Sequence, residues 1–331
     1  MTAKRIAFVA PCVARLEECE VGMPQVGEVR IAMRYTALSA GTEYAFLTGA
    51  PNTGSGFPRY LGYSASAVIT AVGSGVFEYE VGQRVTVYHG RHQSVNNVPS
   101  ERVAPIPDGL DDLSACMTEI GCMGLQGVRK LRMELGESGM VIGLGLLGLF
   151  AVQAMYASGV SPVIAVDYSE ERRNLALELG ARYAFSPDDR DAPEKVNSVT
   201  RGRGANGIVE VTGAESALQL ALKLVSREGR IALTGCTREY REPVDFYALV
   251  HKPGVTIVGA HNAARPERDS RPGYWTRKDD EMALMELMRD GRINARRLIH
   301  NIASPEACED VYARLVNGSL PLGTVFDWTK C

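Results

Sequence analysis

The sequence predicts an α/β protein in which a β-rich part precedes a doubly wound parallel sheet. Three observations carry this prediction. Before residue 115, short alternating β-branched runs are separated by Gly and Pro; after residue 113, strand patterns alternate with helical ones; and a glycine-rich turn joins one such strand to the next helix. Strands that alternate with helices favour βαβ units and a parallel sheet. The length, 331 residues, is typical of about two domains.

The β-rich part is predicted from its strand patterns. Residues 28–37, 67–72 and 83–88 are rich in β-branched side chains and alternate between apolar and polar positions. Glycines and prolines fill the segments between them, where turns are expected. We therefore expect a compact all-β or barrel-like domain here.

The second part is predicted as alternating strands and helices. The expected elements are helix 114–131, strand 139–142, helix 146–158, strand 162–166, helix 170–179, strand 207–211, helix 214–225, and strands 230–233 and 256–259. The tail returns to mixed structure, with helices at 280–290 and 305–317 and a closing strand at 323–326.

Composition excludes several classes of function. The formal net charge is −3 and no block of like charges occurs, so a nucleic-acid partner is not expected. The apolar run at 6–10 is too short for a signal peptide, and glycines interrupt the apolar stretch 140–157, so no membrane partner is expected either. Seven cysteines without a C-x-x-C pair indicate a reduced, cytoplasmic protein.

The glycine-rich turn has the spacing of a dinucleotide site. Gly143, Gly145 and Gly148 form G-x-G-x-x-G between a predicted strand and helix. The first glycine permits the tight turn, the second lets the backbone approach a pyrophosphate, and the third lets the helix pack closely on the sheet. The backbone N–H groups of Leu146 and Leu147, at the start of the helix, are then available to phosphate oxygens. The alternative is a glycine turn that binds nothing.

The coenzyme is predicted to be NAD, with NADP less favoured. Asp167 ends the next strand, about 20 residues further on, where an acidic side chain accepts hydrogen bonds from the ribose hydroxyls. Its charge would repel a 2′-phosphate. Arg172 and Arg173 lie nearby and keep NADP open as an alternative.

The chain as a whole resembles the medium-chain dehydrogenase/reductase superfamily, the zinc alcohol dehydrogenase-like enzymes. The resemblance is carried by A-L-S-A-G-T-E, R-Y-L-G-Y-S-A-S-A-V-I-T-A-V-G-S-G-V, Y-E-V-G-Q-R-V and the glycine turn. Within the superfamily it is most similar to a zinc-ligand-poor branch of bacteriochlorophyllide dehydrogenase-like proteins. It implies a GroES-like catalytic domain (1–118 and 272–331), a Rossmann coenzyme domain (119–271), a small-molecule substrate and a homodimer or homotetramer.

The same resemblance predicts that the catalytic zinc of this family is absent. The positions of its ligands hold Ala40, Tyr63 and Glu119, and Ser64 replaces the glutamate of the family's G-H-E. Alanine donates nothing, and a neutral tyrosine is a poor zinc ligand beside cysteine, histidine or carboxylate. A non-standard metal site from His89, His92, Glu43 and Glu119 is the alternative.

Without zinc, other groups must stabilise negative charge and move a proton. Thr42 matches the family's hydroxyl relay position, and Tyr63 is the expected proton donor, unless it only fills the space of the lost zinc. Glu119 is a candidate hydroxyl acceptor or general base, with an arginine pair as the structural alternative. His89 and His92 are candidates to line the substrate cleft as proton shuttles, and a structural hydrogen-bonding role is the alternative for each.

Two later segments complete the predicted sites. V-E-V-T-G and L-T-G-C resemble the strand ends that face the nicotinamide, which makes Thr212, Gly213 and Cys236 coenzyme candidates. Residues 259–276 combine aromatic and polar groups suited to a sugar or polyol, and His261, Tyr274 and Trp275 are the substrate candidates there. A solvated loop or subunit contact is the alternative for this segment.

The predicted function is an NAD(H)-dependent oxidoreductase that transfers a hydride between nicotinamide and a secondary alcohol or ketone, with sugars or polyols as substrates and without catalytic zinc. Two alternatives remain open at this point. One is a zinc-free reductase of an activated C=C or C=N bond. The other is a non-catalytic NAD(P)-binding protein.

Overall fold

The computed structural model describes residues 1–51, 53–54, 56–237 and 243–331. The chain forms two compact units. The first unit comprises Met1–Ile120, Met285–Arg289 and Ala295–Cys331, and the second comprises Gly121–Leu284 and Asp290–Asn294. Within the described ranges, no helix combines the length and the apolar character needed to cross a bilayer.

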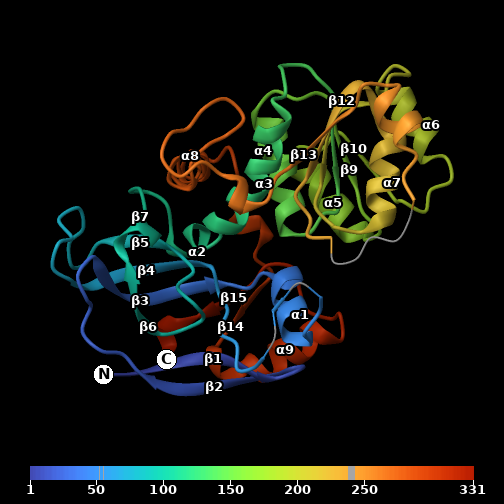
Figure 1. The fold of residues 1–331 in the computed structure, drawn as a ribbon. Helices are drawn as coiled ribbons and strands as arrows, with labels where there is room; N and C mark the ends of the chain where they lie inside the picture. The colour runs from blue at the N-terminus through green and yellow to red at the C-terminus, as the bar shows by residue number, and fades with distance from the viewer. Residues whose placement is uncertain (52, 55, 238–242) are drawn as a thin grey trace. The chain divides into compact units, whose positions relative to one another are not determined.

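The first unit is built on a seven-stranded sheet (Figure 1). Its strand order is β14-β15-β3-β4-β5-β7, and β6 pairs with β3. The strands are β3 (Glu28–Ala37), β4 (Ser64–Val72), β5 (Arg84–Tyr88), β6 (Val95–Pro99), β7 (Val103–Pro105), β14 (Asn301–Ala303) and β15 (Thr324–Asp327). Along the long central strand β3, every second side chain points to the same face of the sheet, and Val29, Ile31 and Met33 on that face are all buried in the core.

Beside this sheet lies an antiparallel hairpin of β1 (Thr2–Ala10) and β2 (Val13–Glu20). The helices of the unit are α1 (Ala40–Thr48), α2 (Asp112–Ala115) and α9 (Cys308–Val316), and α9 packs on β2 and on α1. The ring of Tyr312 on α9 meets the edge of Phe8 on β1 at 4.8 Å between centroids. The C-terminal helix thus closes the core beneath α1.

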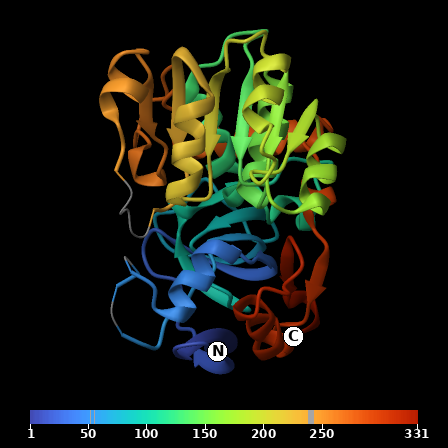
Figure 2. The same cartoon turned by 90° about the vertical axis from the view of Figure 1, so that its right-hand side faces the viewer.

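The second unit is built on a six-stranded parallel sheet in the order β10-β9-β8-β11-β12-β13. Its strands are β8 (Gly139–Ile142), β9 (Val163–Val166), β10 (Tyr183–Phe185), β11 (Ala205–Glu210), β12 (Val225–Leu233) and β13 (Thr256–Gly259). The order reverses between β8 and β11, and ligands bind at the carboxyl ends of the strands at such a switch point. Figure 2 shows these strands side by side among their helices.

The helices of this unit are α4 (Leu146–Ala157), α5 (Glu170–Glu178), α6 (Ala192–Val199) and α7 (Glu215–Leu224). Helices α3 (Thr118–Leu131) and α8 (Arg277–Arg289) belong mostly to it, and one end of each belongs to the first unit. Helix α4 is apolar almost all round, and nine of its residues are buried. A helix of that composition belongs in a core. Helix α5 begins at Ser169, whose hydroxyl accepts a hydrogen bond from the backbone N–H of Arg172 at 3.3 Å.

The predicted α/β class and the parallel sheet are confirmed, with local differences. Three predicted strands (28–37, 139–142 and 256–259) have the predicted bounds. The helix predicted over 114–131 is divided into α2 and α3. At the junction, the Thr118 hydroxyl donates a hydrogen bond to the Ala115 carbonyl oxygen at 2.8 Å and competes with the backbone hydrogen bonds of a continuous helix. Several elements were not predicted as such: the hairpin strands β1 and β2, helix α1, the short strands β6, β7, β10 and β14, and the polar helix α6.

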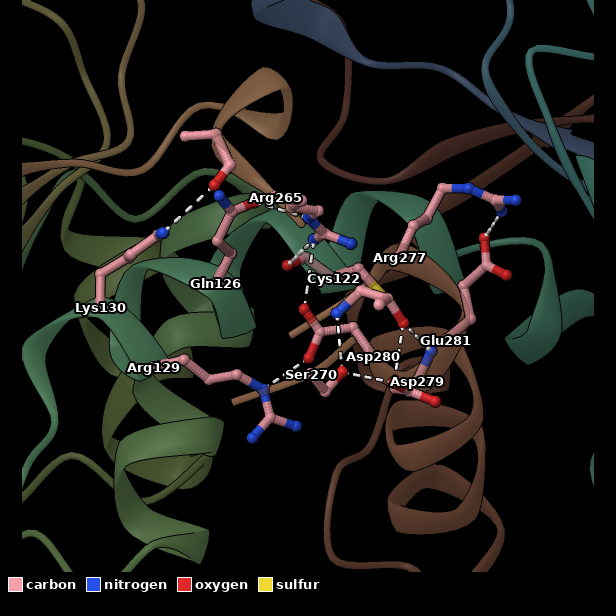
Figure 3. Close-up of polar contacts among 12 residues, drawn as sticks. Cys122, Gln126, Arg129, Lys130, Arg265, Ser270, Arg277, Asp279, Asp280 and Glu281 are labelled. Atoms are coloured by element: carbon pink, nitrogen blue, oxygen red, sulfur yellow. Dashed lines mark hydrogen bonds and ion pairs between the residues drawn. The ribbon is translucent and has the colours of Figure 1, made fainter. Parts of the chain in front are cut away.

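The two compact units divide the chain differently from the predicted domains: residues 272–284 and 290–294 belong to the second unit, and residues 119–120 belong to the first. A buried polar cluster, drawn in Figure 3, holds the 272–284 segment against α3. At its centre Asp280, which is 1% exposed, accepts a hydrogen bond from Arg129 Nε at 2.5 Å and lies 3.6 Å from Arg265 Nη2. Arg265 also donates to the side chain of Gln126 at 2.7 Å and to the carbonyl of Cys122 at 2.8 Å. The cluster therefore ties the loop after β13 and the start of α8 to one helix.

We expect this cluster to carry much of the stability of the second unit. Asp280→Ala leaves two arginines without their buried acid, and breaking a buried ion pair in this way costs about 3–5 kcal/mol. Denaturant unfolding of the variant is therefore expected at a clearly lower midpoint than wild type. The exposed neighbour Lys278 supplies the control, since Lys278→Ala removes no buried contact and is expected to change stability by less than about 0.5 kcal/mol. Equal midpoints for both variants would refute the assignment.

Candidate active site and coenzyme site

Three hydroxyl groups meet at the start of α1 in the first unit. Tyr63, just before β4, is buried, and its hydroxyl donates to Ser39 Oγ at 2.7 Å. The Thr42 hydroxyl, in the first turn of α1, also forms a hydrogen bond with the phenol. Ser39 precedes α1 and caps it only through its backbone. The phenol therefore sits between two hydroxyls that can both donate and accept.

The surroundings of Tyr63 keep its phenol protonated. Burial raises the pKa of Tyr63, and the nearby carboxylates of Glu43 and Glu119 raise it further. The hydrogen bonds from Ser39 and Thr42 act in the opposite direction because they stabilise the phenolate. The raising effects dominate, so Tyr63 suits the role of a hydrogen-bond donor or acid rather than that of a base at neutral pH.

A backbone loop holds His89 beside this phenol. His89 and Arg91 both have left-handed backbones, with φ of 56° and 64°, which is uncommon outside glycine. The loop is held against the preceding strand because His89 N donates to Tyr63 O at 3.1 Å and Arg91 N donates to Gly62 O at 2.8 Å. A Cβ at Gly62 would lie 2.5 Å from the backbone nitrogen of His92, so only glycine fits. The exposed His89 ring lies 6.0 Å from the Tyr63 ring.

His92, predicted to line the substrate cleft, is instead a core residue. It is 1% exposed, its Nε2 lies 3.2 Å from both carboxylate oxygens of Glu43, and its Nδ1 lies 2.6 Å from Thr36 Oγ1. The Thr36 oxygen also accepts a hydrogen bond from Trp328 Nε1 at 2.9 Å. Both ring nitrogens of His92 are thus engaged inside the first unit, and the prediction for this residue was wrong.

Glu43 is the centre of this buried network. Besides His92, its carboxylate accepts hydrogen bonds from the Tyr312 hydroxyl at 2.6 Å and from the backbone N–H of Ser39 at 2.8 Å. Donors from a loop, a C-terminal helix and the start of α1 therefore converge on one acid. Through the Ser39 backbone, the network fixes the residue whose hydroxyl accepts the hydrogen bond of Tyr63.

The residues at the family's zinc positions do not fit a tetrahedral zinc site. Ala40 has no donor atom and the Tyr63 hydroxyl is engaged by two other hydroxyls, which leaves the buried Glu119 as the one carboxylate. The alternative set from the sequence is not assembled, because His92 and Glu43 bind one another. Across the described part of the chain, no group of three or more His, Cys, Asp or Glu side chains could hold a metal ion.

The glycine turn of the second unit has the form of a phosphate cradle. A Cβ at Gly148 would lie 1.8 Å from the Gly143 carbonyl oxygen, so helix α4 approaches the turn as closely as a backbone can. A Cβ at Gly145 would meet nothing within 4 Å, which leaves the space over the turn open. No side chain caps the start of α4. The first N–H groups of this twelve-residue helix, including those of Leu146 and Leu147, are therefore suited to a pyrophosphate.

Asp167 lies at the end of β9 beside this turn. Its Oδ2 accepts a hydrogen bond from Leu144 N at 2.7 Å, and its Oδ1 accepts one from Ser169 N at 2.8 Å. Each oxygen keeps a further lone pair for a ribose hydroxyl. Arg172 is half-buried on α5, whereas Arg173, the second arginine that kept NADP open, donates to the carbonyl oxygens of Asp167 and Tyr168 at 2.7 and 2.8 Å.

A cavity of about 910 Å³ opens at this edge of the sheet. Asp167, Gly143 and Thr212 all line it, so the structure brings these predicted coenzyme residues together. Gly213 follows Thr212 with φ of 71°, and a Cβ there would lie 2.5 Å from the Cys236 carbonyl oxygen. The cavity continues along α7, where Ala214, Glu215, Ser216, Gln219, Leu220 and Lys223 line it.

The predicted substrate residues of the 259–276 segment are not gathered into one site. His261 is exposed, and its Nδ1 accepts a hydrogen bond from Ala263 N at 3.2 Å. Lys130 Nζ lies 3.4 Å from the centroid of the Tyr274 ring, and the Arg129 guanidinium lies 3.5 Å from that of Trp275. Cations thus cover one face of each ring, which is consistent with the structural alternative of a packed loop.

Two residues of these sites were missed from the sequence. Ser39 lies in the A-L-S-A-G-T-E segment, but only the fold brings it to Tyr63. Glu210 lies in V-E-V-T-G, and its side chain accepts hydrogen bonds from the turn that follows. An acid at the end of an apolar strand was the available signal for Glu210. Nothing in the local pattern marked Ser39.

Comparison with known proteins identifies two matching domains. The model for a zinc-binding dehydrogenase matches residues 147–272, and that for an alcohol dehydrogenase GroES-like domain matches residues 25–125. The D-guloside 3-dehydrogenase of Escherichia coli K12 is 28% identical over 98% of this chain and its own entire length.

Solved structures share the fold over nearly the whole chain. An alcohol dehydrogenase of Escherichia coli CFT073 in complex with NADH has a TM-score of 0.84 at 21% identity, covering 98% of this chain and 99% of its own. A Sinorhizobium meliloti 1021 protein assigned as a zinc-binding dehydrogenase, bound to NADP, has a TM-score of 0.84 at 17% identity, covering 99% of each chain. At these identities the likeness establishes the fold.

We expect Glu43 to be indispensable for the first unit. Glu43→Ala leaves His92, the Tyr312 hydroxyl and the Ser39 N–H without their acceptor, and each orphaned buried donor costs about 1–3 kcal/mol. Chemical denaturation should therefore show a loss of about 3 kcal/mol or more. Tyr44→Ala, at the exposed neighbouring position of α1, is the control and should change stability by less than about 0.5 kcal/mol. A Glu43→Ala protein as stable as this control would contradict the role of Glu43.

Proposed function

Because this chain belongs to the medium-chain dehydrogenase/reductase superfamily of zinc alcohol dehydrogenase-like enzymes, we propose that it is an NAD(H)-dependent oxidoreductase that interconverts a secondary alcohol and a ketone without catalytic zinc. Its relatives are dehydrogenases, so an enzyme is favoured over the non-catalytic binding protein that the sequence left open. The observation that carries the proposal is the buried, protonated Tyr63 between Ser39 and Thr42, at a position where the family places a zinc ligand.

The second unit supplies the coenzyme site in this proposal. When bound there, the nicotinamide coenzyme donates or accepts the hydride. The N–H groups at the start of α4 hold the pyrophosphate, and Gly145 leaves the room for it. Asp167 accepts hydrogen bonds from the ribose hydroxyls and disfavours a 2′-phosphate, which supports NAD over NADP.

The first unit supplies the proton chemistry. During carbonyl reduction Tyr63 donates its O–H to the oxygen on which negative charge develops. The hydroxyls of Ser39 and Thr42 stabilise the phenolate oxygen as the proton leaves, and during alcohol oxidation the proton returns along the same path. Glu119, buried near the phenol, is suited to orient a second hydroxyl of the substrate. The exposed His89 exchanges protons with solvent.

A sugar-type or polyol substrate matches the hydrogen-bonding groups of this site. The Escherichia coli relative is a D-guloside 3-dehydrogenase, and its name supports a sugar hydroxyl as the reacting group. In the first unit, hydroxyl, carboxylate and imidazole groups lie around one phenol, and each can pair with a hydroxyl of a polyhydroxylated molecule.

The proton role of Tyr63 is testable by turnover. With NAD and a panel of a methyl guloside, sorbitol and butane-2,3-diol, Tyr63→Phe should lower kcat about 100-fold or more while the KM for NAD stays unchanged, because loss of a general acid typically costs 10²–10⁴-fold. Ser39→Ala should lower kcat less, and in a Tyr63→Phe background it should have no further effect. Tyr63→Phe with near-normal turnover would reject this role and favour reduction of an activated C=C or C=N bond.

Metal content and coenzyme preference are testable on one sample of purified, untagged protein. Elemental analysis should find less than about a tenth of a zinc per chain, since a functional site would require one. Titration followed by nicotinamide fluorescence should show tighter binding of NADH than of NADPH, and Asp167→Ala should narrow that difference. About one zinc per chain would overturn the zinc-free proposal and direct mutagenesis to His89 and Glu119.

A further inference from the structure

Glu210 is a buried acid that no part of the proposed chemistry uses. It ends strand β11, which lies between β8 and β12 in the middle of the parallel sheet, and it is 2% exposed. Across the described ranges of the chain, no Lys, Arg or His forms an ion pair with its carboxylate. Burial raises the pKa of Glu210, because water is excluded without a compensating cation.

The carboxylate instead accepts hydrogen bonds from the turn that follows it. Oε1 accepts from Thr212 N at 2.6 Å, from the Thr212 hydroxyl at 2.5 Å and from Gly213 N at 3.0 Å. Oε2 lies 3.2 Å from the same Gly213 nitrogen. The whole side chain thus serves to fold residues 211–213 back over the end of their own strand.

The backbone of the same residue holds the neighbouring loop. The carbonyl oxygen of Glu210 accepts from Thr234 N at 2.8 Å and from Gly235 N at 3.0 Å, at the end of β12. A Cβ at Gly235 would lie 2.2 Å from Gly213 N, so the two loops touch backbone to backbone. One residue therefore fixes both loops at the carboxyl edge of the sheet.

This pair of loops in turn meets the glycine-rich turn after β8. A Cβ at Gly143 would lie 2.5 Å from Thr212 Cγ2, so the methyl group of Thr212 packs directly on the first glycine of the phosphate cradle. Thr212 and Gly143 line the same cavity of about 910 Å³. A change in the position of Thr212 is therefore transmitted to the glycine turn and to the wall of the cavity.

We propose that Glu210 is a positioning residue of the coenzyme site: its carboxylate sets the Thr212–Gly213 turn, and through Thr212 it sets the shape in which the glycine turn receives the dinucleotide. The inference rests on the coenzyme site of the proposed function. It goes beyond that function because Glu210 acts without touching the coenzyme, by holding the residues that do.

The experiment uses the full-length protein and titration with NADH, followed by nicotinamide fluorescence, together with thermal unfolding of each variant. Glu210→Ala removes the acceptors and should raise the Kd for NADH about tenfold, because part of the binding free energy must then be used to order the Thr212–Gly213 turn. Glu210→Gln keeps an oxygen at the Oε1 position and should stay within about threefold of wild type.

Glu137→Ala is the matched control. Glu137 pairs with Arg230 at the opposite edge of the same sheet, before β8, and it has no contact with the cavity. Its loss should lower the unfolding temperature while the Kd for NADH stays within about twofold of wild type. This control separates a positioning effect from general destabilisation of the sheet.

The outcomes separate the inference from the function on which it rests. Wild-type protein that binds neither NADH nor NADPH would reject the coenzyme site itself. If the wild-type protein binds NADH and the Kd for NADH is the same in Glu210→Ala and Glu137→Ala, the role of Glu210 alone is overturned. Should Glu210→Ala fail to fold, Glu210→Asp replaces it: the shorter side chain withdraws from Gly213, and a Kd equal to that of wild type would again overturn the inference.

Discussion

A carboxylate without access to water must be surrounded by hydrogen-bond donors, and this constraint organises both units of the protein. In the first unit Glu43 is the buried acid. A histidine, a tyrosine hydroxyl and a backbone N–H converge on it from three separate segments. Each donor has to be held at its place because the alternative is an unsatisfied charge in the core. The helix that carries Thr42 is anchored by this requirement.

In the second unit the same constraint acts through backbone rather than side chains. Glu210 takes its donors from the turn that it precedes, and the loops around it approach so closely that only glycine fits at Gly213 and Gly235. The backbone N–H groups of these loops donate hydrogen bonds to Glu210, and this close approach of backbone to backbone fixes the edge of the sheet. Such an edge is preorganised for an anionic dinucleotide before the ligand arrives.

In the proposed zinc-free reaction, protein groups rather than a metal control the phenol of Tyr63. A metal stabilises developing negative charge directly. Here burial and two nearby carboxylates oppose ionisation of the phenol, and two hydroxyls moderate that effect. The result is a group that keeps its proton until a stronger acceptor, such as a developing alkoxide, is placed against it. Hydroxyl chemistry of this kind depends on distances of 2.6–3.2 Å, so rigid support from Glu43 matters.

The sequence by itself determined the features that depend on local pattern. The alternation at Glu28–Ala37, the strand–turn–helix around Gly143 and the acid at Asp167 follow from periodicity and spacing, and the structure brings Gly143, Asp167 and Thr212 to one cavity. Tertiary structure decided the rest. It buried His92 against Glu43, placed Ser39 on Tyr63, and moved residues 272–284 into the second unit through Asp280. Apart from Ser39, which lies four positions from Glu43, the partners of Glu43 and Tyr63 lie 21 to 269 positions away. A local pattern contains no information about which distant donor will reach a buried acceptor.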